Sequence, residues 1–182
     1  MTTIVGISGS LRRRSYNAGL LRAAAGMMPE GANLTIVSIA GVPLYDADVE
    51  ARGIPVAVSA IKDAMAAADG VLLATPEYNN GIPGVFKNAI DWCSRPAEDI
   101  GRVFGGRPFA VIGASPGGFG TILSQDAWLP VLRTLRAQLW TGGRLMIPGA
   151  GKVFDDEGDL TDAAVKQKLK QFLDGFVGSI RA

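Results

Sequence analysis

The strongest constraint on the fold is a regular alternation between short apolar runs and longer segments with helical periodicity. The apolar runs cover 3–8, 33–38, 70–75, 108–114 and, more briefly, 144–147. They are rich in Val, Ile and Leu without polar alternation, which is typical of strands buried on both faces. The helices expected between and after them span about 16–28, 56–69, 84–95, 122–139 and 161–180. Thr161 is expected to cap the last of these helices.

Strands that alternate with helices in this way form an open parallel sheet with helices on both faces. The sequence therefore predicts an α/β fold, a doubly wound sheet of five parallel strands. The chain has 182 residues and shows no linker or internal repeat, so a single domain over 1–182 is expected. In such sheets ligands bind beyond the carboxyl ends of the strands, so the loops after the first, third and fourth strands are the candidate sites.

The chain contains no His and a single Cys, Cys93. The absence of His excludes Ser-His-Asp and Cys-His nucleophile systems and His-containing zinc or iron sites. One Cys cannot form an intramolecular disulfide, and Cys93 is expected to be a small buried apolar residue. If the chain is an enzyme, we expect an organic cofactor to supply its chemistry.

The charge balance favours no nucleic-acid or membrane partner. Lys and Arg number 18 against 17 Asp and Glu, a formal net charge of +1, which gives no general attraction to polyanions. The first residues enter an apolar strand without the regions of a signal peptide. The longest uncharged stretch, 108–125, contains too many Gly and Pro for a membrane helix. We therefore expect a soluble cytoplasmic protein.

The first loop, Gly9–Asn17, has the features of a phosphate site. It reads GSLRRRSYN and leads into a helix that begins near Ser15. A helix start offers free backbone N–H groups and a partial positive charge, to which Ser10, Ser15 and Asn17 add neutral donors. Arg12 adds a charged fork, and the set suits a phosphate monoester. The loop lacks the patterns of triphosphate and dinucleotide sites, so a mononucleotide is indicated. An ordinary capped helix preceded by solvated arginines is the alternative.

The second loop spans 75–84 and reads TPEYNNGIPG. Tyr78 is expected to pack against a flat ring, and Asn79 and backbone amides are expected to bond the ring edge. Turn chemistry alone would also explain the Asn-Asn-Gly run. That alternative leaves Glu77 and Tyr78 without a role.

The third loop spans 113–120 and reads GASPGGFG. Its first five residues match the G-x-S-x-G nucleophile elbow, but without a His base we do not expect a hydrolase. We interpret the loop as glycine-rich backbone that approaches a planar ligand closely and donates N–H groups to it. A purely structural turn is the alternative.

Together the three loops resemble the NAD(P)H-dependent FMN reductase family of flavodoxin-like folds, most closely its bacterial quinone and chromate reductases. The resemblance covers nearly the whole chain and rests on GSLRRRSYN, PEYNNGIPGVFKNAIDW and SPGGFG. It implies a strand order of 2-1-3-4-5 and noncovalently bound FMN. The implied cofactor-binding residues are Ser10, Arg12, Ser15 and Asn17 at the phosphate with Tyr16 beside them, Pro76, Glu77, Tyr78 and Asn79 along the ribityl chain and isoalloxazine, and Ser115, Gly117 and Gly118 at the ring edge. Asn80 departs from the family, because many relatives carry a smaller residue there.

The resemblance also implies an activity. NADPH or NADH gives hydride to flavin N5 and leaves, and an acceptor then takes its place. Quinones are the expected acceptors, with chromate, azo compounds, nitroaromatics and free flavin as others. No side chain is assigned a catalytic role and no metal is expected, because the flavin carries the chemistry. Other interpretations are a flavodoxin-type electron carrier without substrate turnover and a non-enzymatic binding module.

Oligomerisation is expected on the same grounds. The resemblance implies a homodimer or homotetramer, with the helix around Phe86 and Trp92 at the interface. Apolar residues at helical spacing are also typical of a core, so Trp92 has that alternative.

Overall fold

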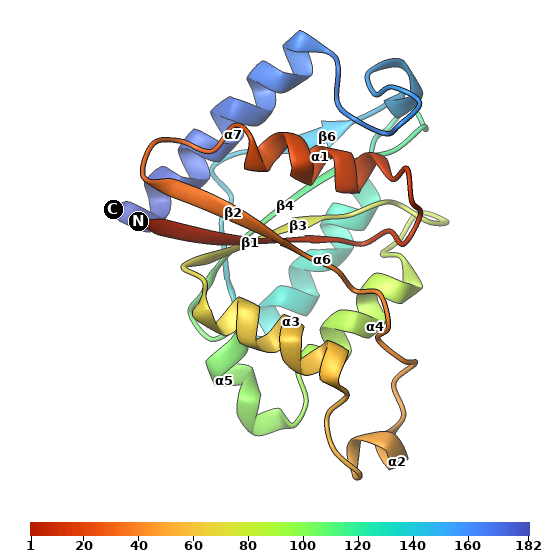
Figure 1. Cartoon of the computed structure of the whole chain (residues 1–182), viewed down its shortest axis with the longest axis vertical. Coiled ribbons are helices and arrows are strands. Elements are labelled where there is room, and N and C mark those ends of the chain that lie inside the picture. Colours follow the sequence, from red (N-terminus) through yellow and green to blue (C-terminus); the bar gives the residue numbers. More distant parts are fainter.

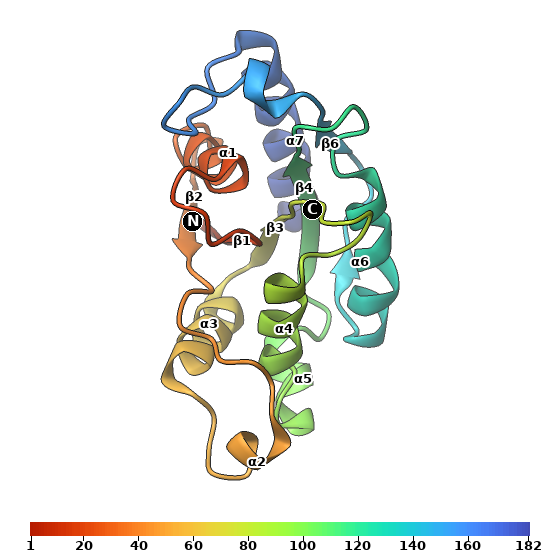
Figure 2. The same ribbon diagram turned by 90° about the vertical axis from the view of Figure 1, so that its right-hand side faces the viewer.

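Strands from most of the chain's length form one parallel sheet (Figure 1, Figure 2). The computed structural model describes residues 1–182. Its strands are β1 (Thr2–Ser8), β2 (Ala32–Val37), β3 (Gly70–Ala74), β4 (Pro108–Ala114), β5 (Gln138–Leu139) and β6 (Leu145–Ile147). The order is β2-β1-β3-β4-β5, with β6 also paired to β4, and every pair is parallel. The predicted fold class and strand order are confirmed.

The fifth position of the sheet is divided between two short strands. β5 pairs with the start of β4, where Pro108 faces Gln138, and β6 pairs with its end, where Ile112 faces Leu145. The run expected at 144–147 is therefore only the second half of this strand. The first half, β5, lies within the stretch 122–139 that was expected to be helical.

That helix, α6 (Ile122–Thr134), ends early because the chain turns at Arg136, whose φ is 61°. The N–H of Arg136 donates to the Arg133 carbonyl at 3.1 Å, and the N–H of Ala137 donates to the Leu132 carbonyl at 3.0 Å. This pair of bonds is a Schellman motif, which normally has Gly at the left-handed position. Because Arg136 occupies that position instead, no local residue signal marks the end of α6.

The other helices are α1 (Tyr16–Ala25), α2 (Ala47–Glu50), α3 (Val56–Ala67), α4 (Gly84–Cys93), α5 (Ile100–Val103) and α7 (Ala163–Arg181), with 3₁₀ turns at Ala97–Asp99 and Ala150–Lys152. Helices α1 and α7 cover one face of the sheet, and α3, α4 and α6 cover the other (Figure 1, Figure 2). The short helices α2 and α5 were not expected.

The cap of α7 differs from the prediction. The carboxylate of Asp162 accepts from the Val165 N–H at 2.8 Å. Thr161 instead donates its hydroxyl to the Val153 carbonyl at 3.2 Å. The expected Thr161 cap is therefore wrong by one residue, because α7 begins after Asp162, which takes the N-cap position, while Thr161 contacts Val153.

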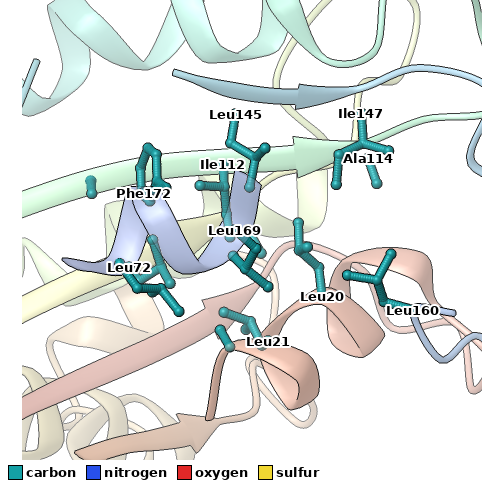
Figure 3. Close-up of a cluster of buried hydrophobic side chains, with 14 of the residues drawn as sticks. Leu20, Leu21, Leu72, Ile112, Ala114, Leu145, Ile147, Leu160, Leu169 and Phe172 are labelled. Atoms are coloured by element: carbon teal, nitrogen blue, oxygen red, sulfur yellow. The ribbon is translucent and has the colours of Figure 1, made fainter. Parts of the chain in front are cut away.

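Each face of the sheet carries its own hydrophobic core. Figure 3 shows the core under α1 and α7, where Leu20 and Leu21 of α1 meet Leu72 of β3 and Leu169 of α7. The core on the opposite face includes Trp128 of α6 and residues of α3 and α4. No helix combines the length and the apolarity that crossing a bilayer requires.

Helix α4 directs its large aromatic side chains inward. Phe86 and Trp92 are 0% exposed. The Phe86 ring lies edge-on to Trp128 with centroids 4.9 Å apart, and the Trp92 indole N–H donates to the Pro43 carbonyl at 2.9 Å. The core interpretation of Trp92 is confirmed, and these two side chains do not reach the surface to meet another chain. Cys93 is also buried, as expected, and burial raises the pKa of its thiol to about 12.

Candidate functional site

The carboxyl ends of β1, β3 and β4 open into one pocket of about 270 Å³. All three loops identified from the sequence contribute to its walls. The lining residues are Ser10, Arg12, Ser15, Tyr16, Asn17, Pro76, Glu77, Tyr78, Ala114, Ser115 and Pro116. The structure therefore brings together the expected site residues except Asn79, Gly117 and Gly118. Ala114 and Pro116 were not among the expected site residues, although both lie within the third loop, 113–120, and that position was a usable signal.

Two serines of the first loop combine a structural bond with a free hydroxyl hydrogen. Ser15 is the N-cap of α1, and its Oγ accepts from the Ala18 N–H at 3.3 Å. The Oγ of Ser10 accepts from the Arg12 N–H at 3.3 Å. Since each bond uses the oxygen only as an acceptor, both hydroxyls remain able to donate to an anion. Ser15 lies at the start of α1, where the helix dipole also favours negative charge.

Arg12 places an unpaired positive charge at the pocket. Its guanidinium carbon lies 4.6 Å from the centroid of the Tyr16 ring, a cation–π contact that orients the side chain. No carboxylate lies within salt-bridge distance of it, whereas Arg14 pairs with Glu157 at 3.0 Å. Only the first residue of the Arg12–Arg14 run lines the pocket. The charge of Arg12 is therefore available to a bound anion.

Asn17 connects the first and third loops. Its side-chain amide donates to the Ala114 carbonyl at 2.9 Å, and its carbonyl oxygen accepts from the Ala114 N–H at 2.9 Å. The side chain is 3% exposed, so these bonds tie the start of α1 to the end of β4 inside the protein. The resemblance implied a phosphate contact for Asn17, but its observed contacts are with the protein.

The second loop contains a tight turn. Tyr78 and Gly81 exchange two backbone hydrogen bonds of 3.1 Å, and the residues between them, Asn79 and Asn80, have φ of 50° and 62°. Two central residues with positive φ are typical of a type I′ turn, and Asn tolerates this conformation. Turn chemistry thus accounts for both asparagines, while Tyr78, which is 50% exposed, remains at the pocket wall.

The carboxylate of Glu77 faces helix α6. Its Oε2 accepts from the N–H groups of Leu123 and Ser124 at 2.8 and 3.0 Å. These bonds direct the carboxylate toward the N-terminus of α6, where the helix dipole offsets part of its negative charge.

In the third loop, packing explains the nucleophile-like pattern. A side chain at Gly113 would overlap the carbonyl of Thr75 and the hydroxyl of Thr121, so glycine is required there. The Oγ of Ser115 accepts from the Gly117 N–H at 3.2 Å and has no base beside it. Gly117 and Gly118 are exposed, so their backbone is open to a ligand at the pocket's rim.

These features define a class. A parallel sheet with this strand order, with a donor-rich first loop and a glycine-rich third loop at its carboxyl edge, is a flavodoxin-like fold. The family model for NADPH-dependent FMN reductase matches residues 2–152. The chain therefore belongs to the NADPH-dependent FMN reductase family. It is an oxidoreductase that uses FMN, with NAD(P)H as the electron donor.

Individual relatives agree with this assignment. The chain is 43% identical over 170 residues to "NAD(P)H-dependent FMN reductase PA1204" of Pseudomonas aeruginosa, covering 93% of this chain and 90% of the relative. It is 37% identical over 175 residues to "2-hydroxy-1,4-benzoquinone reductase" of a Burkholderia species, covering 96% and 94%. Among solved structures, the flavoenzyme NAD(P)H:(acceptor) oxidoreductase FerB of Paracoccus denitrificans superposes with a TM-score of 0.87 at 32% identity, covering 100% of this chain and 98% of that one.

The donor set of the pocket fits FMN. The phosphate of FMN is a monoester, and the first loop offers it one unpaired guanidinium, two free hydroxyl hydrogens and a helix N-terminus. The only carboxylate among the lining residues, that of Glu77, is bound to α6. The pocket thus combines cationic and neutral donors with no free anion.

Proposed function

We propose that this protein is a quinone reductase that passes electrons from NADPH or NADH to small flat acceptors by way of noncovalently bound FMN. The unpaired Arg12 guanidinium in a pocket shared by three loops carries the proposal. Two relatives support the choice of acceptor, because their names describe reduction of 2-hydroxy-1,4-benzoquinone and of quinone. Chromate, azo compounds, nitroaromatics and free flavin are further candidates.

We assign the site residues as follows. Bound FMN supplies the redox chemistry, since it accepts a hydride and passes electrons onward. Ser10, Arg12 and Ser15 hold its phosphate, with Tyr16 and Asn17 supporting them. The wall for the ribityl chain and ring consists of Pro76, Glu77, Tyr78 and Asn79, and the ring edge meets Ser115, Gly117 and Gly118. No side chain needs to exchange a proton, which agrees with a chain without His.

Donor and acceptor would occupy the site in turn. All three loops converge on the same pocket, which supports a single site that the nicotinamide and the acceptor would occupy one after the other. This order predicts parallel lines in double-reciprocal plots when donor concentration is varied at several acceptor concentrations.

The test begins with the visible spectrum of purified protein that has been mixed with FMN and then desalted. Flavin bands close to stoichiometric with protein would establish FMN as a bound cofactor rather than a passing substrate. Oxidation of NADPH and NADH is then followed with a benzoquinone as acceptor, and steady turnover separates a reductase from an electron carrier. A protein that neither retains FMN nor oxidises NAD(P)H with added FMN and quinone would contradict the proposal, and failure to bind any flavin would favour a binding module.

We also propose that the protein forms a homodimer or homotetramer with α4 at the interface. Because Phe86 and Trp92 are internal, outward residues of α4 such as Val85, which is 40% exposed, would make the contact. Light scattering of wild type and Val85→Glu tests this, and a strictly monomeric wild type would contradict it. We further propose one FMN-binding domain over 1–182 and a cytoplasmic location, where NAD(P)H is available.

A further inference from the structure

Helix α6 has no cap from its own sequence. The residue before it, Thr121, makes no capping bond, and its hydroxyl accepts from the side-chain amide of Gln125 at 3.0 Å. The first N–H groups of any α-helix lack partners within the helix. At α6 those partners must therefore come from elsewhere in the chain.

Glu77 supplies them from 46 residues upstream. Its Oε2 accepts from the N–H groups of both Leu123 and Ser124, at 2.8 and 3.0 Å. A carboxylate at this end of a helix also interacts favourably with the helix dipole. Helix α6 is thus capped by a side chain of the second loop.

A buried contact beside this cap ties the same two elements together. The hydroxyls of Thr75 and Ser124 lie 2.8 Å apart, and the Trp128 indole N–H donates to the Thr75 hydroxyl at 3.1 Å. All three side chains are 0% exposed. Residues at the end of β3 therefore hold α6 through several bonds, of which the Glu77 pair lies nearest the pocket wall.

This geometry links two walls of the pocket. Glu77 lies between Pro76 and Tyr78, which line the pocket, and the third loop runs directly into α6. We propose that Glu77 is a positioning residue whose carboxylate, by capping α6, sets the spacing between the second and third loops that FMN binding requires. The proposal rests on the FMN site described above. It assigns the Glu77 carboxylate an action through α6, in addition to the place of Glu77 in the pocket wall.

Two conservative variants separate the effect of the length of the residue-77 side chain from the effect of its charge. Glu77→Gln keeps a single oxygen at the same distance, which suffices because one oxygen accepts both bonds. Glu77→Asp keeps the charge but is one methylene shorter. The matched control is Asp162→Ala, which removes a carboxylate cap from α7, a helix that contributes no residue to the pocket.

The readouts are the dissociation constant of FMN, from quenching of flavin fluorescence, and the thermal midpoint of the flavin-free protein. We expect Glu77→Asp and Glu77→Ala to raise the Kd about fivefold to tenfold, the equivalent of about 1–1.4 kcal/mol and within the range for a lost cap. Glu77→Gln should restore most of the affinity. Asp162→Ala should lower the thermal midpoint and leave the Kd unchanged. If Glu77→Ala does not fold, the Asp and Gln variants decide alone.

The proposal is overturned if Glu77→Gln weakens binding as much as Glu77→Asp, because an uncharged oxygen at the right distance would then fail to restore the affinity. It is also overturned if Asp162→Ala raises the Kd equally, because general destabilisation would explain the effect. Arg12→Ala, measured in parallel, tests the phosphate site itself. An unchanged Kd for Arg12→Ala with a raised Kd for Glu77→Asp contradicts the proposed phosphate contact and supports the positioning role. The reverse result overturns the positioning role alone.

Discussion

Replacement of Arg12 by Ala should weaken FMN binding by about 1–3 kcal/mol. A hydrogen bond to a charged group contributes about 1.5–3 kcal/mol. Arg12 is exposed, so salt screens its interaction with the phosphate, and the lower limit of the expected loss is about 1 kcal/mol. No carboxylate competes for the guanidinium, and the Tyr16 ring holds it 4.6 Å from the ring centroid, so little of its interaction with phosphate is offset. The expected loss corresponds to a Kd raised about 5-fold to 150-fold.

The assay is a fluorescence titration of flavin-free protein at fixed ionic strength, with FMN and with riboflavin. Riboflavin lacks the phosphate, so its Kd should be the same in wild type and Arg12→Ala. Arg13→Ala is the matched control, because it removes the same charge from an exposed neighbour that does not line the pocket. Arg12→Lys should fall between wild type and Arg12→Ala, since Lys keeps the charge without the planar fork.

Two results would refute this reasoning. An equal loss of riboflavin and FMN affinity in Arg12→Ala would show that Arg12 supports the pocket's shape and does not contact the phosphate. An equal effect of Arg13→Ala and Arg12→Ala on FMN would show that only the net charge of the loop matters.

Three further predictions concern stability and reactivity. Asn17→Leu leaves the N–H and carbonyl of Ala114 unpaired and should lower the free energy of unfolding by about 2–4 kcal/mol; a chemical denaturation curve that overlies the wild type would contradict this. Hydrogen bonds, first from Arg102, lower the pKa of Asp99 to about 2. Its stabilising contribution is therefore complete above the unfolded pKa of about 3.9 and lost as the pH falls toward 2, so Asp99→Asn should lower the thermal midpoint at neutral pH but not at the acid end of a pH series. Because the thiol pKa of Cys93 is raised to about 12 by burial, iodoacetamide should label it only after denaturation, as mass spectrometry would show.

Several parts of the fold and site were predictable from short stretches of sequence. Apolar runs of Val, Ile and Leu identified β1, β3 and β4, because a strand covered on both faces must be apolar nearly throughout. The run at β2 was also recognised as a strand, but β2 lies at the edge of the sheet, with Thr35 and Ile36 exposed. The donor set of the first loop was predictable because Ser10, Arg12 and Ser15, which all line the pocket, lie within a few residues of one another before a helix. The glycines of the third loop likewise reflect a local steric demand, as the crowding around Gly113 shows.

What remained hidden depends on contacts between distant residues. The first half of the fifth strand was missed because Arg136 occupies a turn position where Gly is the usual signal. Large aromatic residues such as Phe86 and Trp92 occur both at protein interfaces and in hydrophobic cores. Only their contacts with Trp128 and Pro43 show that these two side chains belong to the core.

The same distinction holds within the site. From its sequence alone the chain specifies a parallel α/β sheet with a mononucleotide pocket at its carboxyl edge, because strand composition and a phosphate loop are local properties. The hydrogen-bond partners of Asn17 and Glu77 lie 97 and 46 residues away along the chain, and no local sequence pattern predicts them. Only the tertiary structure shows that these two side chains bind the protein's own backbone. Their hydrogen-bond partners depend on which loops and helix starts the folded sheet brings together.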